Sequence, residues 1–196
     1  SVSSYYKGAR IGDIWGWQVE GLFKDQADID AHANQTGYFK ISTDYVWKPG
    51  DIKFKDLDGS GTIDLGENRV GASGDRKIIG NTTPRYRYGL NLGAEYCNFN
   101  LSMFFQGVGK RNWWPHNESA FFWGQYNRPY SYGLKIQDEN HRWTEENQNV
   151  NAYWPRMRGY AGEYYNHELG SASDKYLQNA GYLRLKNVSF GYTFTQ

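Results

Sequence analysis

Apolar and polar residues alternate most regularly over residues 86–96, where every even position is apolar or aromatic and every odd position is polar or glycine. Over residues 99–108 the alternation continues with the opposite parity, although Phe104 interrupts the polar positions. A period of two is typical of a β-strand, and Cys97 with Asn98 suits a two-residue turn. The pattern predicts two long, adjacent antiparallel strands joined at that turn.

Three further segments carry weaker patterns. Residues 188–194 alternate, whereas Leu183 and Leu185 have the other parity, so we expect a bulge or bend near Lys186 and Asn187. Residues 11–19 are a fourth strand candidate. Asp25 is suited to cap a short helix over residues 26–33.

The length of the strands bears on the fold class. Strands of soluble sandwiches usually have about five or six residues, whereas runs of about ten residues suit a strand that crosses a membrane. The expected fold class is therefore all-β: antiparallel strands of a transmembrane β-barrel, present as an incomplete segment, with long loops and a short loop helix. A long hairpin on a soluble sheet is the alternative. We expect residues 1–196 to be part of one barrel domain.

Regular alternation disappears over residues 110–181, which are rich in Trp, Tyr, Asn and Gly. A connection of this length exceeds ordinary loops, and barrels place their long loops on the extracellular face. We predict that rings of this loop region contact a substrate or a partner protein, and the sequence does not separate these two uses. The candidates are Trp113, Trp114, Trp123 and Tyr126.

Composition narrows the classes of function. The 22 basic and 21 acidic residues leave a net charge of +1, which is too balanced for electrostatic capture of nucleic acid or anionic lipid by the net charge of the chain. The mean hydropathy of −0.83 and the lack of a long apolar run exclude a helical membrane protein but not a barrel. The 8 Trp, 17 Tyr and 10 Phe outnumber the 27 Leu, Ile and Val, so rings dominate the apolar residues. We interpret the chain as a piece of a longer one.

Residues 56–67 match the twelve-position calcium loop. Oxygen-bearing residues occupy positions 1, 3, 5, 7, 9 and 12, and Gly61 at position 6 permits the sharp turn that brings them together. The flanking residues lack helical patterns, so we expect an isolated loop that binds one structural Ca²⁺. A metal-free turn rich in Asp and Gly is the alternative. The expected ligands are Asp56, Asp58, Ser60, Thr62 through its carbonyl, Asp64 through a water molecule, and Glu67.

Signals for catalysis are weak. His32, His116, His141 and His167 are scattered without ligand spacing, and the sequence lacks GxSxG, HExxH and the phosphate-binding GxxxxGK[ST] motif. The acidic pairs at 138–139 and 145–146 are more typical of a solvated surface than of a glycosidase. The chain is not expected to be an enzyme.

Several segments together resemble the C-terminal barrel region of the SusC/RagA family of TonB-linked outer membrane proteins. They are residues 49–64, the pair Asp75 and Arg76 followed by 77–80, the strand at 89–96, residues 104–108 and the block 182–192. The likeness runs with gaps from about residue 12 to the end. Two features differ from the family pattern: Asp58 and Ser60 replace its usual Asn and Asp, and residues 65–74 look like an insertion.

The resemblance implies a TonB-dependent importer in the outer membrane of a Gram-negative bacterium. Such a barrel is surrounded by outer membrane lipid, contacts TonB through a plug that is not part of this sequence, and pairs with a SusD-like surface lipoprotein. The substrates that the resemblance implies are oligosaccharides or peptides. The alternative from the residues themselves is a soluble, calcium-stabilised, β-rich module that binds glycans.

Overall fold

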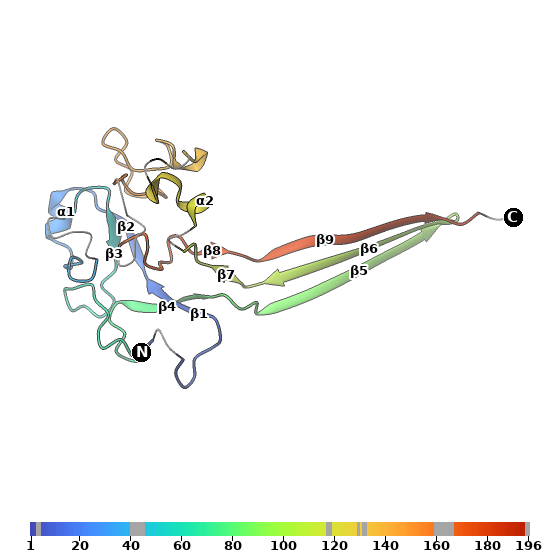
Figure 1. Cartoon of the computed structure of the whole chain (residues 1–196), viewed down its shortest axis with the longest axis horizontal. Coiled ribbons are helices and arrows are strands. Elements are labelled where there is room, and N and C mark those ends of the chain that lie inside the picture. Colours follow the sequence, from blue (N-terminus) through green and yellow to red (C-terminus); the bar gives the residue numbers. More distant parts are fainter. Residues whose placement is uncertain are drawn as a thin grey trace. The chain divides into compact units, whose positions relative to one another are not determined.

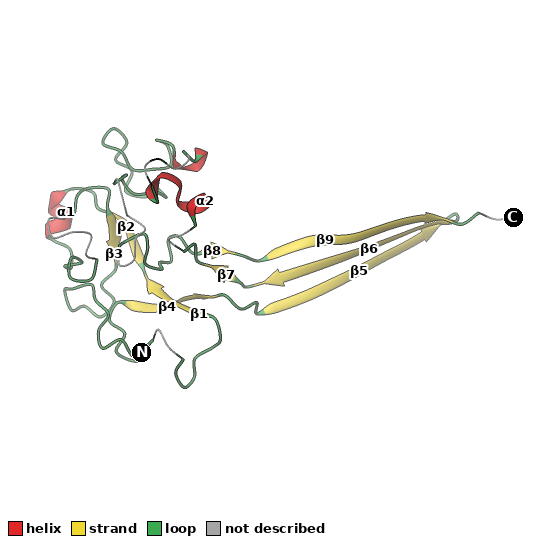
Figure 2. Cartoon of the chain, in the orientation of Figure 1, coloured by secondary structure: helices red, strands yellow, loops and turns green. Residues whose placement is uncertain are grey.

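The computed structural model describes residues 1–2, 5–39, 46–116, 119–128, 130, 133–158 and 167–194. Strands predominate in this part of the chain, and the helices are short (Figures 1 and 2). None of the described helices is long and apolar enough to cross a membrane. The chain divides into two compact units, one of residues 1–80 and 114–177 and the other of residues 81–113 and 178–196.

The second unit contains a three-stranded antiparallel sheet in the order β5-β6-β9 (Figure 1). Its strands are β5 (Tyr86–Tyr96), β6 (Phe99–Gly109) and β9 (Tyr182–Tyr192), each of 11 residues. A short ribbon of β7 (Asn112–Trp113) and β8 (Gln178–Asn179) belongs to the same unit. The described strands leave β5 and β9 as open edges of this sheet.

The predicted hairpin is confirmed. Tyr96 pairs with Phe99, and the register continues without a break to Tyr86 opposite Gly109. Cys97 and Asn98 have φ angles of 46° and 69°, as a type I′ turn requires at both central residues. Asn tolerates this left-handed conformation better than most residues, so the local sequence fixes the turn and hence the register.

The predicted bulge is also confirmed, and it has a clear consequence. Phe104 pairs with Asn187 and Phe105 pairs with Leu185, so Lys186 is the extra residue. Since the side-chain period is two, one extra residue returns both halves of β9 to the same parity relative to β6. Leu183 and Leu185 therefore share a face of the sheet with Val188 and Phe190.

The first unit contains two small sheets and short helices. Strand β1 (Asp13–Trp17) pairs with β4 (Arg76–Asn81), and β2 (Val19–Leu22) pairs antiparallel with β3 (Ile52–Phe54). The helices are α1 (Gln26–Asp30), α2 (Ala120–Trp123), η1 (Gly124–Tyr126) and η2 (Lys135–Gln137). The strand expected at 11–19 is therefore interrupted at Gln18, where Lys55 donates its backbone N–H to the Gln18 carbonyl.

The predicted cap of α1 is confirmed, because the Asp25 carboxylate accepts a hydrogen bond from the backbone N–H of Asp28. The helix ends at Asp30, earlier than the predicted 33. Asn34 donates its backbone N–H to the Gly61 carbonyl and accepts from the Ile63 N–H, so the chain leaves the helix to pair with the acidic loop.

Aromatic rings form the core of the first unit. Phe39 and Phe54 stack with ring centroids 4.3 Å apart, and Trp154 stacks on both Tyr126 and Tyr176 at 5.1 and 5.4 Å. These rings come from both 1–80 and 114–177, which explains why the two stretches fold as one unit. Residues 114–177 thus share a core with the N-terminal stretch. That all 196 residues are part of one barrel domain stays a prediction.

Candidate functional site: an apolar sheet face and an acidic loop

One face of the β5-β6-β9 sheet is apolar from end to end. The Cα pairing places Leu90 opposite Phe105, and Phe105 opposite Leu185. The next rows toward the turn are just as apolar. The face comprises Tyr86, Tyr88, Leu90, Leu92, Ala94, Tyr96, Phe99, Leu101, Met103, Phe105, Gly107, Gly109, Leu183, Leu185, Val188, Phe190 and Tyr192.

Many of these side chains are exposed to solvent in the isolated chain. Leu90 is 51% exposed, Leu183 62% and Phe190 68%. Rings lie at both ends of the face: Phe99 packs against Phe190 and Tyr192 near the turn, and Tyr88 lies over Gly107 at the other end. Aliphatic side chains and Phe105 fill the middle. A contiguous apolar surface of this extent indicates contact with lipid or with another protein.

The opposite face is mainly polar. It carries Arg87, Asn91, Glu95, Asn100, Ser102, Gln106, Arg184 and Ser189, with Gly89 and Gly93 between them. The apolar exceptions are Phe104, whose ring lies against Gly89, and Val108 and Tyr182 at the end away from the turn. The sheet is therefore amphipathic across its thickness.

The acidic loop lies in the first unit, where Asp56 and Asp58 approach a third acid, Asp75. One carboxylate oxygen from each lies within 4.8 Å of the others. The Asp56 carboxylate accepts hydrogen bonds from the backbone N–H groups of Gly59 and Gly61, at 2.7 and 2.8 Å. Gly61 has a φ of 80°, so it supplies the turn expected at position 6.

Sequence reasoning missed Asp75 as a member of this cluster. Its buried carboxylate accepts hydrogen bonds from the backbone N–H groups of Leu57 and Asp64, at 2.6 and 2.9 Å, and so links the second and ninth positions of the loop. Residues 65–74 bring the chain back to the loop, where Gly66 and Gly74 are in close contact. The space is so tight that a Cβ on Gly74 would lie 2.4 Å from the Asp64 carbonyl oxygen. The only signal was the Asp75-Arg76 pair within the resemblance.

The other expected ligands are engaged as follows. Ser60 donates its hydroxyl to the Thr62 carbonyl at 3.0 Å, and Asp64 accepts from the Gly66 N–H at 2.6 Å. The Glu67 carboxylate forms an ion pair with Arg69 and is not a member of the three-acid cluster found among the described residues. The structure thus presents Asp75 at the cluster, where the motif suggested Glu67.

The protonation of the cluster reflects its surroundings. Burial raises the pKa of Asp75, and the charges of Asp58 and Asp56 add to this effect, against the lowering by its backbone donors. Slight burial also favours a higher pKa for Asp56, but hydrogen bonds from the backbone N–H groups of Gly61, Gly59 and Ser60 outweigh it and lower the pKa of that carboxyl. A cation between the acids would relieve the repulsion that raises the pKa of Asp75.

The four ring residues expected to contact a substrate or partner have different surroundings. Trp123 and Tyr126 are buried in the core, and Tyr126 donates its hydroxyl to the Pro155 carbonyl at 2.6 Å. Trp114 is 9% exposed and packs edge-on against Trp123. Trp113, in β7, is 43% exposed. Of the four rings, Trp113 therefore offers the large accessible surface.

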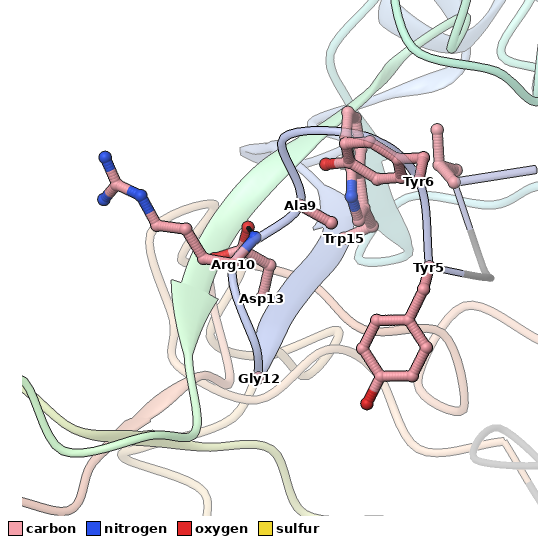
Figure 3. Close-up of a pocket in the computed structure, with 8 residues that line it drawn as sticks. Tyr5, Tyr6, Ala9, Arg10, Gly12, Asp13 and Trp15 are labelled. Atoms are coloured by element: carbon pink, nitrogen blue, oxygen red, sulfur yellow. Dashed lines mark hydrogen bonds between the residues drawn. The ribbon is translucent and has the colours of Figure 1, made fainter.

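A cavity of about 280 Å³ near the start of the chain is lined by further rings (Figure 3). Tyr6 meets Trp15 edge to face at 6.3 Å, and Tyr5 is 85% exposed. The backbone N–H of Arg10 donates to the Asp13 carboxylate at 3.1 Å and shapes the turn below the rings. Stacking rings beside polar groups suit a sugar or a peptide side chain, and sequence reasoning had not selected these residues.

The comparisons with known proteins bear on the sheet and the loop alike. No protein-family model matches the chain. The chain is 27% identical to TonB-dependent receptor P3 of Formosa agariphila over 190 residues, which cover 97% of this chain. The chain spans about 16% of that relative's length. Over nearly all of its length, the chain is therefore similar to a portion of a TonB-dependent receptor.

Proposed function

We propose that this chain is part of a TonB-dependent importer in the outer membrane of a Gram-negative bacterium, with β5, β6 and β9 as membrane-spanning strands. The amphipathic sheet carries this proposal. A barrel strand needs apolar side chains toward lipid and polar side chains toward the lumen, with aromatic girdles at both interfaces. Each of the three strands presents an apolar row on one face and mainly polar residues on the other, in register. Near the turn all three strands contribute rings to the apolar face, and at the other end β5 contributes Tyr86 and Tyr88.

The length of the strands supports the same assignment. Eleven residues at about 3.3 Å each extend roughly 36 Å. Tilted by about 45°, such a strand spans roughly 25 Å, the height of the apolar band of outer-membrane barrels. The open edges at β5 and β9 are where the remaining strands of a closed barrel would pair.

The connections suggest the orientation. Barrels have short periplasmic turns and long extracellular loops. The two-residue turn at Cys97 and Asn98 then lies in the periplasm, and the chain that leaves β6 and returns to β9 lies outside the cell. In this orientation Trp113 is accessible to an oligosaccharide or peptide substrate, or to a SusD-like lipoprotein. TonB would act through a plug contributed by another part of the receptor.

Cys97 provides a test of this orientation in the complete receptor. A membrane-impermeant maleimide added to intact cells should leave Cys97 unmodified and should modify it after the outer membrane is permeabilised. In a Cys97→Ser background, Trp113→Cys should react on intact cells. The opposite labelling pattern would reject the orientation, and equal labelling of both sites in a soluble periplasmic fraction would reject the membrane assignment.

A soluble, calcium-stabilised glycan-binding module is the second candidate, and the ring-lined cavity favours it. This alternative gives the apolar sheet face no partner. A soluble module of this size should stay monomeric without detergent, whereas an exposed lipid-facing sheet should aggregate.

We also propose that the acidic loop binds one structural Ca²⁺ in either case. The twelve-residue spacing and the convergence of Asp56, Asp58 and Asp75 support this site, and carboxylate oxygens are the ligands that Ca²⁺ prefers. Without flanking helices to hold the loop, we expect a Kd of about 10⁻⁴ to 10⁻³ M, as in extracellular modules.

Calorimetric titration of Ca²⁺ into chelator-treated protein tests this site. Asp56→Ala should abolish binding, and Asp75→Asn should weaken it by at least about tenfold, because each removes a charged ligand. Glu67→Gln is the matched control and should bind like the parent, since Glu67 pairs with Arg69. Loss of binding in Glu67→Gln alone would favour the ligand set of the sequence motif, and a parent that binds nothing at millimolar Ca²⁺ would remove the site.

A further inference from the structure

Charge is distributed unevenly in the unit that contains the long sheet. Its sequence has six cations and a single acid, Glu95. Glu95 lies one residue before the end of β5 at the turn, whereas all six cations lie in or beside the other half of the strands. The cations are Arg85, Arg87, Lys110, Arg111, Arg184 and Lys186. Among the described residues none of these six forms an ion pair.

Two of these cations lie at the margin of the apolar face. Tyr86 begins the apolar row of β5, and its ring centroid lies 5.9 Å from the Arg85 guanidinium carbon and 5.9 Å from the Lys110 ammonium nitrogen. The backbone N–H of Arg85 donates to the Lys110 carbonyl at 3.4 Å, which holds the two residues next to each other across the strand ends. Tyr86 is 51% exposed, and Arg85 and Lys110 are exposed as well, so the ring and both cations are accessible.

Other cations of the unit belong to the polar face and provide a contrast. Arg87 follows Tyr86 and has the opposite parity, and Arg184 lies over the Tyr182 ring at 4.3 Å. If the sheet is part of a barrel, these two face the lumen. Arg85 and Lys110 lie just outside β5 and β6, so the strand period does not assign them to a face, and both lie beside the ring of Tyr86 at the edge of the apolar face.

We propose that Arg85, Tyr86 and Lys110 form a binding site for the phosphate of a phosphorylated glycolipid in the outer leaflet, whose acyl chains lie along the apolar face. The site rests on the proposed function, which places this end of the sheet at the outer surface. Arginine and lysine donate charge-assisted hydrogen bonds to phosphate oxygens, and clusters of such residues beside a membrane surface attract anionic lipid headgroups. The absence of an acidic partner among the described residues leaves both side chains available for this contact.

Lipid binding by the complete receptor in detergent tests the site. The probes are lipid A with its phosphates and the same lipid A after phosphatase treatment, and native mass spectrometry counts the molecules retained. We expect the parent to prefer the phosphorylated form by about 30-fold, since each cation near an anionic headgroup contributes on the order of fivefold. Arg85→Gln/Lys110→Gln should lose this preference. The control Arg87→Gln/Arg184→Gln removes equal charge from the polar face and should keep it.

Equal retention of both forms by the parent, or equal loss in the control variant, would overturn the headgroup site. A spin label at Leu92→Cys, in an otherwise cysteine-free receptor reconstituted into vesicles, separates this failure from failure of the barrel proposal. A label accessible to oxygen but not to a water-soluble nickel complex lies against acyl chains. That result without a phosphate preference rejects the lipid site alone, whereas a label accessible to nickel on this face rejects the membrane-spanning sheet as well.

Discussion

Replacing Arg158 by alanine should destabilise the first unit, whose core is formed by aromatic rings, by about 3 to 5 kcal/mol. This is the cost of leaving a buried charge without its partner. Arg158 donates through Nε to the Asp51 carboxylate at 3.0 Å, and its Nη1 lies 3.1 Å from the Glu168 carboxylate. The Asp51 and Glu168 side chains are only 1% and 3% exposed. Arg156 also donates through Nε to the Asp51 carboxylate, at 2.6 Å, so Glu168 is the acid that the variant leaves without its cation.

The loss should depend on pH. Burial raises the pKa of Glu168 to about 7 even with Arg158 in place, and removing the cation raises it further. A carboxyl group whose pKa is raised in the folded state stabilises the fold while it is protonated. This stability is lost as the pH rises through the raised pKa. The variant should therefore be closer to the parent at pH 5 than at pH 8.

Hydrogen exchange of the complete receptor measures this effect locally. At pH 8 the amides around Asp51 should exchange about two to four decades faster in Arg158→Ala, at 1.36 kcal/mol per decade. Arg10→Ala is the control, because Arg10 is an exposed arginine of the same unit and should change stability by less than about 0.5 kcal/mol. Unchanged protection in Arg158→Ala would show that the ion cluster does not stabilise this unit.

Replacing Leu92 by arginine should reduce the stability of the receptor in lipid by about 2 to 4 kcal/mol, the cost of a cation near the bilayer midplane of a barrel. Leu92 lies near the centre of β5, opposite Met103, which in turn pairs with Val188. All three are on the apolar face. In water the same change should cost little, because Leu92 is already 44% exposed in the isolated chain.

Denaturant-dependent folding into lipid vesicles measures this loss of stability and allows the two faces of the sheet to be compared. The matched control is Asn91→Arg, which adds the same charge at the adjacent position on the polar face, opposite Phe104. It should change stability much less than Leu92→Arg. Equal costs for the two variants would contradict the assignment of the apolar face to lipid.

Several features of this protein could be predicted because they depend on neighbours in the chain. The period-2 pattern of 86–96 and 99–108 specified the strands, and Cys97 with Asn98 specified the turn. The change of parity between Leu185 and Val188 required one extra residue, which the structure places at Lys186. The cap at Asp25 is equally local, since it needs only a carboxylate three residues before the N–H that it accepts from.

The first unit could be predicted less well because its contacts are long-range in sequence. High ring content was visible in the sequence, but it did not indicate that Trp123 and Tyr126 would be buried in a core shared with residues 1–80. Nor did any pattern join Asp51 to Arg158. Aromatic rings carry no period of their own in irregular segments, so their burial depends on packing partners distant in sequence.

The acidic loop shows which features follow from the local sequence and which depend on the tertiary structure. The sequence by itself determined the amphipathic strands, their turn and bulge, and the spacing of Asp56, Asp58 and Gly61, because each follows from residues a few positions apart. Only the tertiary structure decided that Asp75 joins the cluster and that Glu67 pairs with Arg69 instead. The reason is physical: the path of residues 65–74, closed by the contact of Gly66 with Gly74, determines which carboxylates converge, and backbone contacts of that kind leave no periodic signal in the sequence.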